Sequence, residues 1–120
     1  MKHSQFIRHI LIPRLNDIGN RLNYKASEYA KDGNIFHNFN QGAQFDSITP
    51  KRCLWDYMRK QLISIKDLVD DNKKATPKLV DEKIGDVICY LILLEGIIKH
   101  TEFDQLPDTK PLITHKPLNQ

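Results

Sequence analysis

Two pairs of acidic residues, each spaced four apart, have the residue types and spacing that could support chemistry. Glu82 and Asp86 form one pair, and Glu28 and Asp32 form the other. Side chains four apart on a helix lie on one face, where two like charges repel. A shared Mg²⁺ would offset that repulsion, because this ion prefers carboxylate oxygens and keeps waters that can bridge to phosphate. The alternative is that Glu82 and Asp86 are both solvated near a helix start, where the helix dipole favours negative charge.

Arg21 lies on the same side of its predicted helix as the second acidic pair. At about 100° per residue, Asp17, Arg21, Glu28 and Asp32 fall close to one line. Arg21 can form an ordinary surface ion pair with Asp17, or it can lie near a bound phosphate, which suits a guanidinium group. If two helices bring their acidic pairs together, four carboxylates would bind one or two Mg²⁺ ions. Such ions could hold a triphosphate and lower the pKa of an attacking water.

Three long helices are expected to position these residues. Apolar residues at spacings of three and four predict a first helix over residues 4–31. Pro13 removes a backbone donor, so this helix should kink or start afresh near Ile12 or Pro13. Thr49 and Thr76 each precede a proline, and a threonine N-cap followed by proline is typical of a helix start. The second helix therefore begins at about residue 49, and the third runs from about residue 76 to His100.

The third helix is apolar nearly all round between residues 84 and 98. A helix with this composition is covered on most sides. We therefore expect it at the centre of the fold or in a subunit interface, as part of a homodimer or homotetramer. Glu95 lies on its apolar side, where a carboxylate is costly unless it is paired or exposed at the helix end.

A segment with three phenylalanines connects the first two helices. Residues 34–49 contain Phe36, Phe39 and Phe45 among asparagines and a glycine. We expect an irregular loop that either packs back onto the core or closes over a pocket as a lid. Residues 103–120 carry prolines and no helical period, so we expect an irregular tail after a helical domain over residues 1–102. The predicted fold class is all-α, with three long helices in an antiparallel bundle.

Composition limits the classes of protein that fit. The 120 residues make one domain, and the net charge of +3 is spread over interspersed acids and bases, which gives no strong nucleic-acid signal. The longest apolar run, residues 87–94, is far shorter than the roughly 20 residues of a membrane span. No secretion signal follows Met1, so we expect a cytoplasmic protein in which Cys53 and Cys89 are reduced and buried.

Three segments resemble the MazG-like all-α nucleotide pyrophosphohydrolases, in particular their small phage-type members. Residues 81–91 are similar to the MazG-type segment Glu-Glu-Leu-Gly-Asp-Val-Leu-Phe-Tyr-Leu-Leu. Residues 25–39 are similar to the phage-type pattern Lys-x-x-(Asp/Glu)-Tyr-Ala followed by Asn-Phe. Residues 58–65 are similar to a Lys-His-x-x-Ser-Ile segment. The three segments occur in the order found in the family.

The resemblance implies an Mg²⁺-dependent enzyme that hydrolyses a nucleoside triphosphate to the monophosphate and pyrophosphate. It also implies roles for particular residues. The metal ligands would be Glu82, Asp86, Glu28 and Asp32. Catalysis would involve Glu28, as a ligand or general base, and Lys60, while substrate would be bound by Lys25, Asn38 and Phe39.

Two departures from the family pattern favour a different class of protein, one without catalytic activity. Glu28-x-x-x-Asp32 stands where the family has Glu-x-x-Glu, and Gln61 stands where the phage-type pattern has histidine. A catalytically inactive helical protein, such as a phage factor that binds a host protein or a nucleotide, would tolerate both changes. A plain structural module that dimerises through the third helix is a further alternative.

Overall fold

Every regular element of the described chain is a helix. The computed structural model describes the backbone of residues 1–29 and 34–103, and the side chains of these residues except 25–29. The elements are α1 (His3–Phe6), the π-helix η1 (Ile7–Leu11), α2 (Ile12–Tyr29), α3 (His37–Asp46), α4 (Pro50–Val69), α5 (Pro77–Ile98) and the π-helix η2 (Lys99–Phe103). The all-α prediction is therefore confirmed. The predicted tail, apart from Phe103, lies outside the described residues.

The first helical stretch changes its hydrogen-bonding pattern just before Pro13. The π-helix η1 ends at Leu11, and the regular α-helix α2 starts at Ile12. Pro13 lies just after this π-helical stretch and has no N–H group to donate to the preceding turn. Ile12 itself has right-handed helical dihedral angles, with φ of −61° and ψ of −50°, and the helical backbone is continuous from η1 into α2. The change near Pro13 is therefore one of hydrogen-bonding pattern and not the fresh helix start that the sequence predicted. The backbone of α2 is described as far as Tyr29, two residues short of the predicted end at residue 31.

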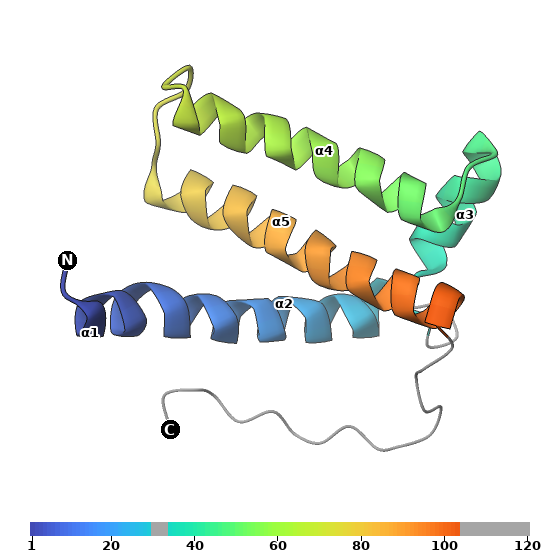
Figure 1. Cartoon of the computed structure of the whole chain (residues 1–120), viewed down its shortest axis with the longest axis horizontal. Helices are drawn as coiled ribbons and strands as arrows, with labels where there is room; N and C mark the ends of the chain where they lie inside the picture. The colour runs from blue at the N-terminus through green and yellow to red at the C-terminus, as the bar shows by residue number, and fades with distance from the viewer. Residues whose placement is uncertain (30–33, 104–120) are drawn as a thin grey trace.

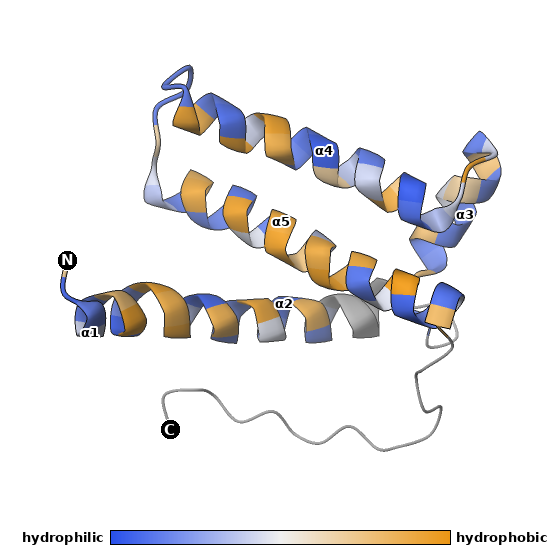
Figure 2. Ribbon diagram, viewed as in Figure 1, coloured by the Kyte–Doolittle hydropathy of each residue, from blue (hydrophilic) through white to orange (hydrophobic). Residues whose placement is uncertain are grey.

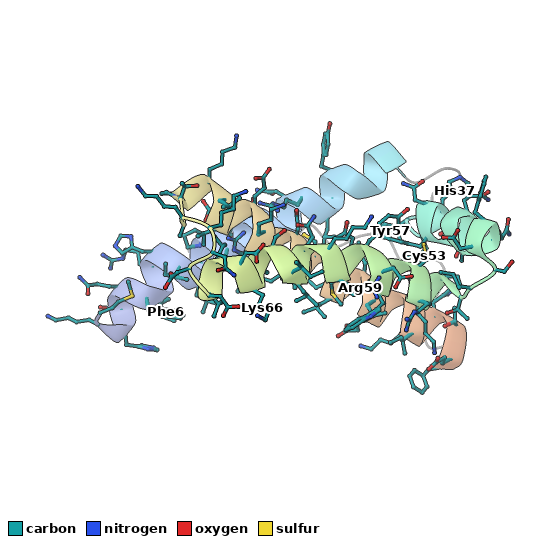
Figure 3. The ribbon with its side chains drawn as sticks, turned by 90° about the horizontal axis from the view of Figure 1, so that it is seen from above. Phe6, His37, Cys53, Tyr57, Arg59 and Lys66 are labelled. Carbon is teal, nitrogen blue, oxygen red and sulfur yellow. The ribbon has the colours of Figure 1, made fainter. Side chains whose placement is uncertain are left out.

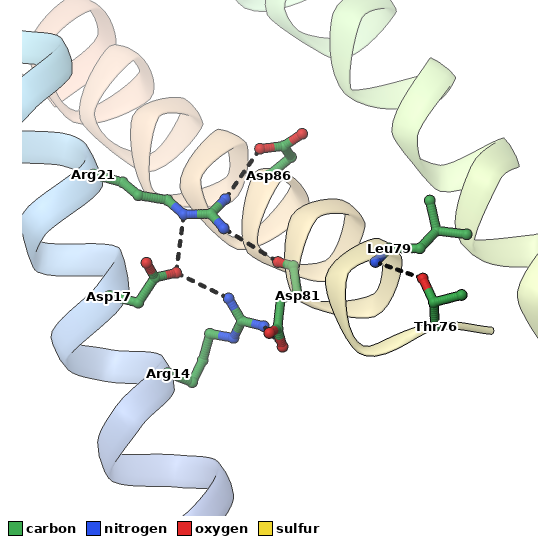
Figure 4. Close-up of polar contacts among 7 residues, drawn as sticks. All are labelled: Arg14, Asp17, Arg21, Thr76, Leu79, Asp81 and Asp86. Carbon is green, nitrogen blue, oxygen red and sulfur yellow. Dashed lines mark hydrogen bonds and ion pairs between the residues drawn. The ribbon is translucent and has the colours of Figure 1, made fainter.

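Both threonine caps form as the sequence indicates. The backbone N–H of Arg52 donates a hydrogen bond to Thr49 Oγ1 at 3.2 Å. The backbone N–H of Leu79 donates to Thr76 Oγ1 at 3.2 Å (Figure 4). Each cap satisfies a donor that the first turn of a helix leaves without a partner. The helical backbone beyond α5 continues through η2 to Phe103, slightly past the predicted end near His100.

The predicted irregular loop is wrong, because most of residues 34–49 form helix α3. Phe39 and Ala43, four residues apart, are the buried residues of this helix, and burying one apolar stripe stabilises a helix whose residues have only modest intrinsic propensity. Ser47 ends the helix in the left-handed conformation with φ of 55°. The expectation that the phenylalanines pack on the core holds for Phe39, which is buried, whereas Phe45 is 91% exposed.

Helix α5 lies between α4 and α2, and α3 covers one end of α4 (Figure 1). Consecutive long helices run in opposite directions, so α2 and α5 run in the same direction (Figure 1). The fully buried side chains are Leu54, Met58 and Cys89. The main core cluster consists of Phe39, Ala43, Cys53, Leu54, Leu93 and Ile97. This cluster joins α3, α4 and α5, and both cysteines are free thiols in the buried part of the fold.

Apolar residues continue around α5 onto a side that no other described element covers (Figure 2). Cys89, Leu93 and Ile97 are buried, whereas Ile84, Leu91 and Ile92 are exposed. The central position expected for this helix therefore accounts for only part of its apolar surface. Separately, no helix of the described chain is both long and apolar enough to cross a lipid bilayer.

We predict that Gly42→Ala destabilises the protein, because α3 and α4 are in very close contact at this residue. A Cβ at residue 42 would lie 2.8 Å from the Sγ of buried Cys53. Overpacking of this kind costs about 1–3 kcal/mol, which exceeds the gain of up to about 1 kcal/mol from replacing glycine with alanine in a helix. Urea denaturation measures the change in unfolding free energy. The double variant Gly42→Ala/Cys53→Ala removes the clash, so the cost of Gly42→Ala should shrink in that background; an equal cost in both backgrounds contradicts the explanation.

Candidate functional site

Asp86 is held at the contact between α2 and α5 by Arg21 (Figure 4). Arg21 Nη1 lies 3.2 Å from Asp86 Oδ1, and Arg21 Nε lies 2.9 Å from Asp17 Oδ2. The same guanidinium donates through Nη2 to the backbone carbonyl oxygen of Asp81 at 3.3 Å. The surface ion pair expected between Arg21 and Asp17 is therefore present. Arg21 also connects α2 to one of the carboxylates predicted to bind metal.

A second arginine completes this ion-pair network. Arg14 Nη1 lies 3.0 Å from Asp17 Oδ2, and Arg14 Nη2 lies 3.4 Å from Asp81 Oδ1 (Figure 4). Two guanidinium groups thus face three carboxylates, which leaves a formal excess of one negative charge. Such a network favours a bound cation over a bound anion at this contact.

Gly85 makes room for the two guanidinium groups. A Cβ at this residue would lie 2.6 Å from Arg21 Nη1 and 2.7 Å from Arg14 Nη1. The glycine of the segment that resembles the MazG-type pattern therefore has a structural role here, because any larger residue would push the arginines away from α5.

Glu82 is exposed one turn before Asp86 on α5. It forms no hydrogen bond or ion pair with the side chains that the structure describes, so its carboxylate is accessible to a ligand. In that part of the chain, no group of three or more His, Cys, Asp or Glu residues is placed to hold a metal ion. The predicted partners Glu28 and Asp32, and the predicted substrate-binding residue Lys25, lie outside the described side chains.

Tyr57 of α4 links two other predicted residues. Its ring centroid lies 6.0 Å from that of Phe39 in an edge-to-face arrangement and 5.9 Å from Lys60 Nζ. Lys60 and Tyr57 line a small pocket of about 240 Å³, together with Asp46, Ile48, Cys53 and Asp56. Phe39 is a buried core residue in contact with Tyr57, and Asn38 is exposed at the start of α3. The aromatic ring that a ligand could reach is therefore that of Tyr57, which is 44% exposed.

Tyr90 connects the surroundings of Asp86 to those of Tyr57. Burial is the main factor that raises the pKa of Tyr90, and the nearby Asp86 carboxylate and Tyr57 hydroxyl raise it further. Two turns before Tyr90 on α5, Lys83 Nζ donates a hydrogen bond of 3.2 Å to Gln61 Oε1 of α4. Polar groups of α4 and α5 therefore lie near one another at Tyr57 and Tyr90 and at Gln61 and Lys83. Figure 3 shows Tyr57 on the side of α4 opposite to Arg59 and Lys66.

The sequence analysis assigned no role to four residues of the site and its surroundings: Arg14, Tyr57, Lys83 and Tyr90. Tyr90 follows Asp86 by one helical turn and was thus within reach of spacing arguments. Arg14 and Tyr57 have no such signal, because their importance comes from contacts with other helices. No protein-family model, curated protein or solved structure matches this chain, so the assignment of function depends on the site itself.

Proposed function

We propose that this protein is an Mg²⁺-dependent nucleoside triphosphate pyrophosphohydrolase of the MazG-like type, acting in the cytoplasm. The observation that carries the proposal is the pair formed by exposed Glu82 and half-buried Asp86. These carboxylates lie one turn apart on α5, beside α2, the helix that also carries Glu28. Two carboxylates at this spacing supply hard oxygen donors to a single cation.

The described residues fit one side of an Mg²⁺ site. Glu82 and Asp86 would hold the ion, with Glu28 and Asp32 as the proposed remaining ligands. Mg²⁺ would position the triphosphate and lower the pKa of a bound water. The excess negative charge of the neighbouring network also favours a cation there. Arg21 would orient the Asp86 carboxylate and neutralise part of its charge.

Phosphate and base are proposed to be bound on the surface between Asp86 and Lys60. Lys60, held over the Tyr57 ring, would neutralise phosphate charge together with Lys25. Asn38 would contact the base, and Phe39 would act from beneath by supporting Tyr57 through their edge-to-face contact. An exposed tyrosine is suited to stack against a base.

A specific contact favours a second candidate, a helical protein that binds a nucleotide or another protein without catalysis. Asp86 already has a cationic partner in Arg21, and Gln61, in place of the family's histidine, accepts a hydrogen bond from Lys83. Asp86 and Gln61 therefore each have a partner within the chain in the absence of a metal. This candidate predicts binding of a nucleotide or protein partner with no release of pyrophosphate.

A screen of nucleoside triphosphates with Mg²⁺, measured as released pyrophosphate, tests the enzyme proposal. We expect release with at least one nucleotide and none when Mg²⁺ is removed with a chelator. Calorimetry with the same nucleotides measures binding independently. Binding without release in every case would favour the second candidate, and release that persists without any divalent cation would contradict the assigned role of Glu82 and Asp86.

A further inference from the structure

The pocket of about 240 Å³ beside Tyr57 lies where α3 and α4 meet, and we call it the α3–α4 pocket. Cys53, Tyr57 and Lys60 line it from one face of α4, because they are spaced four and three residues apart. Asp46, the last residue of α3, and Ile48 also line it. The volume is below the roughly 300–1,000 Å³ of sites that enclose a drug-sized ligand. The α3–α4 pocket is therefore suited to a single ring system and not to a whole nucleotide.

The carboxylate of Asp46 is open to a ligand. Asp46 is exposed and forms no hydrogen bond or ion pair with the side chains of the described ranges. It stands at the C-terminal end of α3, where the helix dipole disfavours a negative charge. An ionised carboxylate only accepts hydrogen bonds, so both oxygens of Asp46 are available to N–H donors of a ligand.

The second carboxylate of the pocket, that of Asp56, has its charge balanced at long range. Asp56 Oδ1 lies 3.6 Å from Arg52 Nε and 3.9 Å from Arg59 Nη2. Both distances exceed the 2.7–3.2 Å that is typical of an N–H···O hydrogen bond. With Lys60 in the lining, three cationic side chains surround two carboxylates. This balance disfavours a cationic ligand and is compatible with a neutral ring that carries an anionic group.

The thiol of Cys53 argues against a metal ion in the pocket. Burial raises the pKa of the Cys53 thiol, and the nearby carboxylates of Asp46 and Asp56 raise it further. The thiol is therefore neutral at pH 7, whereas a metal ligand or nucleophile is the thiolate. Although three Cys or Asp residues line this pocket, no group of three or more His, Cys, Asp or Glu within the described ranges is placed to hold a metal ion. An organic ligand with N–H donors fits this lining better.

We propose that the α3–α4 pocket binds the guanine base of a nucleotide and that Asp46 selects this base. Guanine presents two adjacent donors, N1–H and the N2 amino group, and one carboxylate accepts both in parallel. Adenine and cytosine present a donor beside an acceptor nitrogen, and uracil and thymine present one N–H between two carbonyl oxygens. Each of these bases would place a lone pair against the carboxylate. Tyr57, which is 44% exposed, offers an aromatic ring for stacking.

The guanidinium group of an arginine has the same pair of parallel donors. It carries a positive charge, however, which Lys60 and the two arginines beside Asp56 would repel. A neutral base avoids this repulsion, and the phosphates attached to it are attracted by Lys60. The charges around the pocket therefore favour a nucleotide over a peptide.

The position of Lys60 connects the pocket to the proposed metal site. The hydrogen bond between Gln61 of α4 and Lys83 of α5 sets which residues of the two helices lie at the same level. Counted from this contact, Lys60 lies within about one helical turn of the level of Asp86. A nucleotide whose base is in the pocket would extend its phosphates past Lys60 in this direction. The inference rests on the nucleotide binding in the proposed function, but it does not depend on catalysis.

Calorimetry with nucleoside triphosphates in excess chelator tests the selection without hydrolysis. We expect GTP to bind most tightly. Inosine triphosphate lacks the N2 amino group and should bind at least about 10-fold more weakly, because a hydrogen bond to a charged acceptor changes affinity by about 10- to 100-fold. ATP, CTP and UTP present neither matched pair of donors and should bind at least about 100-fold more weakly.

Asp46→Asn should reverse the preference between two bases. The asparagine amide accepts one hydrogen bond and donates another, which matches xanthine, whose C2 carries a carbonyl oxygen in place of the amino group. We expect this variant to bind GTP at least about 10-fold more weakly than the parent does, and to bind xanthosine triphosphate more tightly than GTP. Asp70→Asn is the matched control, because Asp70 also stands at the C-terminal end of a helix but does not line the pocket.

Equal affinity for all nucleotides, or no binding of any, overturns the inference. A parent-like order of affinities in Asp46→Asn overturns it as well, because a merely structural role of Asp46 would not reverse the preference. The proposed activity can fail separately. Selective GTP binding with no release of pyrophosphate after Mg²⁺ is restored supports the inference and contradicts the enzyme proposal. Equally efficient release from every nucleotide supports the enzyme proposal and contradicts the inference.

Discussion

Asp86→Asn and Glu82→Gln should each reduce Mg²⁺-dependent release of pyrophosphate by at least about 100-fold while the helical fold persists. Either change removes one of the two carboxylate donors that α5 offers to the metal, and an amide is a much weaker ligand for this hard cation. Removing a group that acts only with the metal lowers kcat and kcat/KM together. Steady-state kinetics with the best nucleotide from the screen measures both constants.

The fold should survive these changes for reasons visible in the structure. Glu82 is exposed, and exposed charges contribute little to stability. Asp86 loses its ion pair with Arg21, but Arg21 keeps Asp17 at 2.9 Å, so no guanidinium is left without a partner. Matched controls are Glu102→Gln in η2 and Asp70→Asn at the C-terminal cap of α4, which remove exposed carboxylates that belong to other ion pairs. Activity that is equal in the controls and in both site variants would remove Glu82 and Asp86 from the mechanism.

Helix starts were predictable from sequence because they depend on neighbouring residues. The threonine caps at Thr49 and Thr76 each satisfy a donor three residues away. Pro13, which has no N–H group, likewise lies next to the change from π-helical to α-helical hydrogen bonding at Ile12. Helix α3 was missed because its asparagines and glycine favour turns, while its stability comes from burying Phe39 and Ala43 against other helices. Such long-range packing leaves no mark on local propensity.

In the candidate site, too, the features that depend on neighbouring residues were predictable and those that depend on long-range packing were not. Spacing identified Glu82 and Asp86 as a pair on one helical face, and it allowed two partners for Arg21. The ion pair between Arg21 and Asp86 joins residues 65 positions apart, so only the packing of α2 on α5 could reveal it. Gly85 likewise looks like part of a motif in the sequence, but its closeness to both arginines depends on the crossing of these helices. Contacts within one helix could be predicted, whereas contacts between helices could not.

Leu54→Ala should cause the largest loss of stability of any single truncation proposed here. Leu54 is 0% exposed and lies in the cluster that joins α3, α4 and α5. Removing a fully buried leucine side chain costs about 2–5 kcal/mol, because lost burial is added to the cavity left behind. A domain of this size has a total unfolding free energy of about 5–15 kcal/mol, so the variant should be marginally stable. Urea denaturation of the parent and the variant at the same protein concentration measures the difference in unfolding free energy.

Ile63→Ala is the matched control for Leu54→Ala, because Ile63 lies on the same helix and is 57% exposed. Its truncation should cost less than about 1 kcal/mol, as is usual for surface positions. The comparison also connects the core to the site: Leu54 packs in the same cluster as Phe39, whose ring supports Tyr57. If α3 is held in place by this cluster, nucleotide affinity should fall in Leu54→Ala, under conditions where the variant is still folded, and stay unchanged in Ile63→Ala. Equal stability losses in the two variants would mean that the core is centred elsewhere than on Leu54.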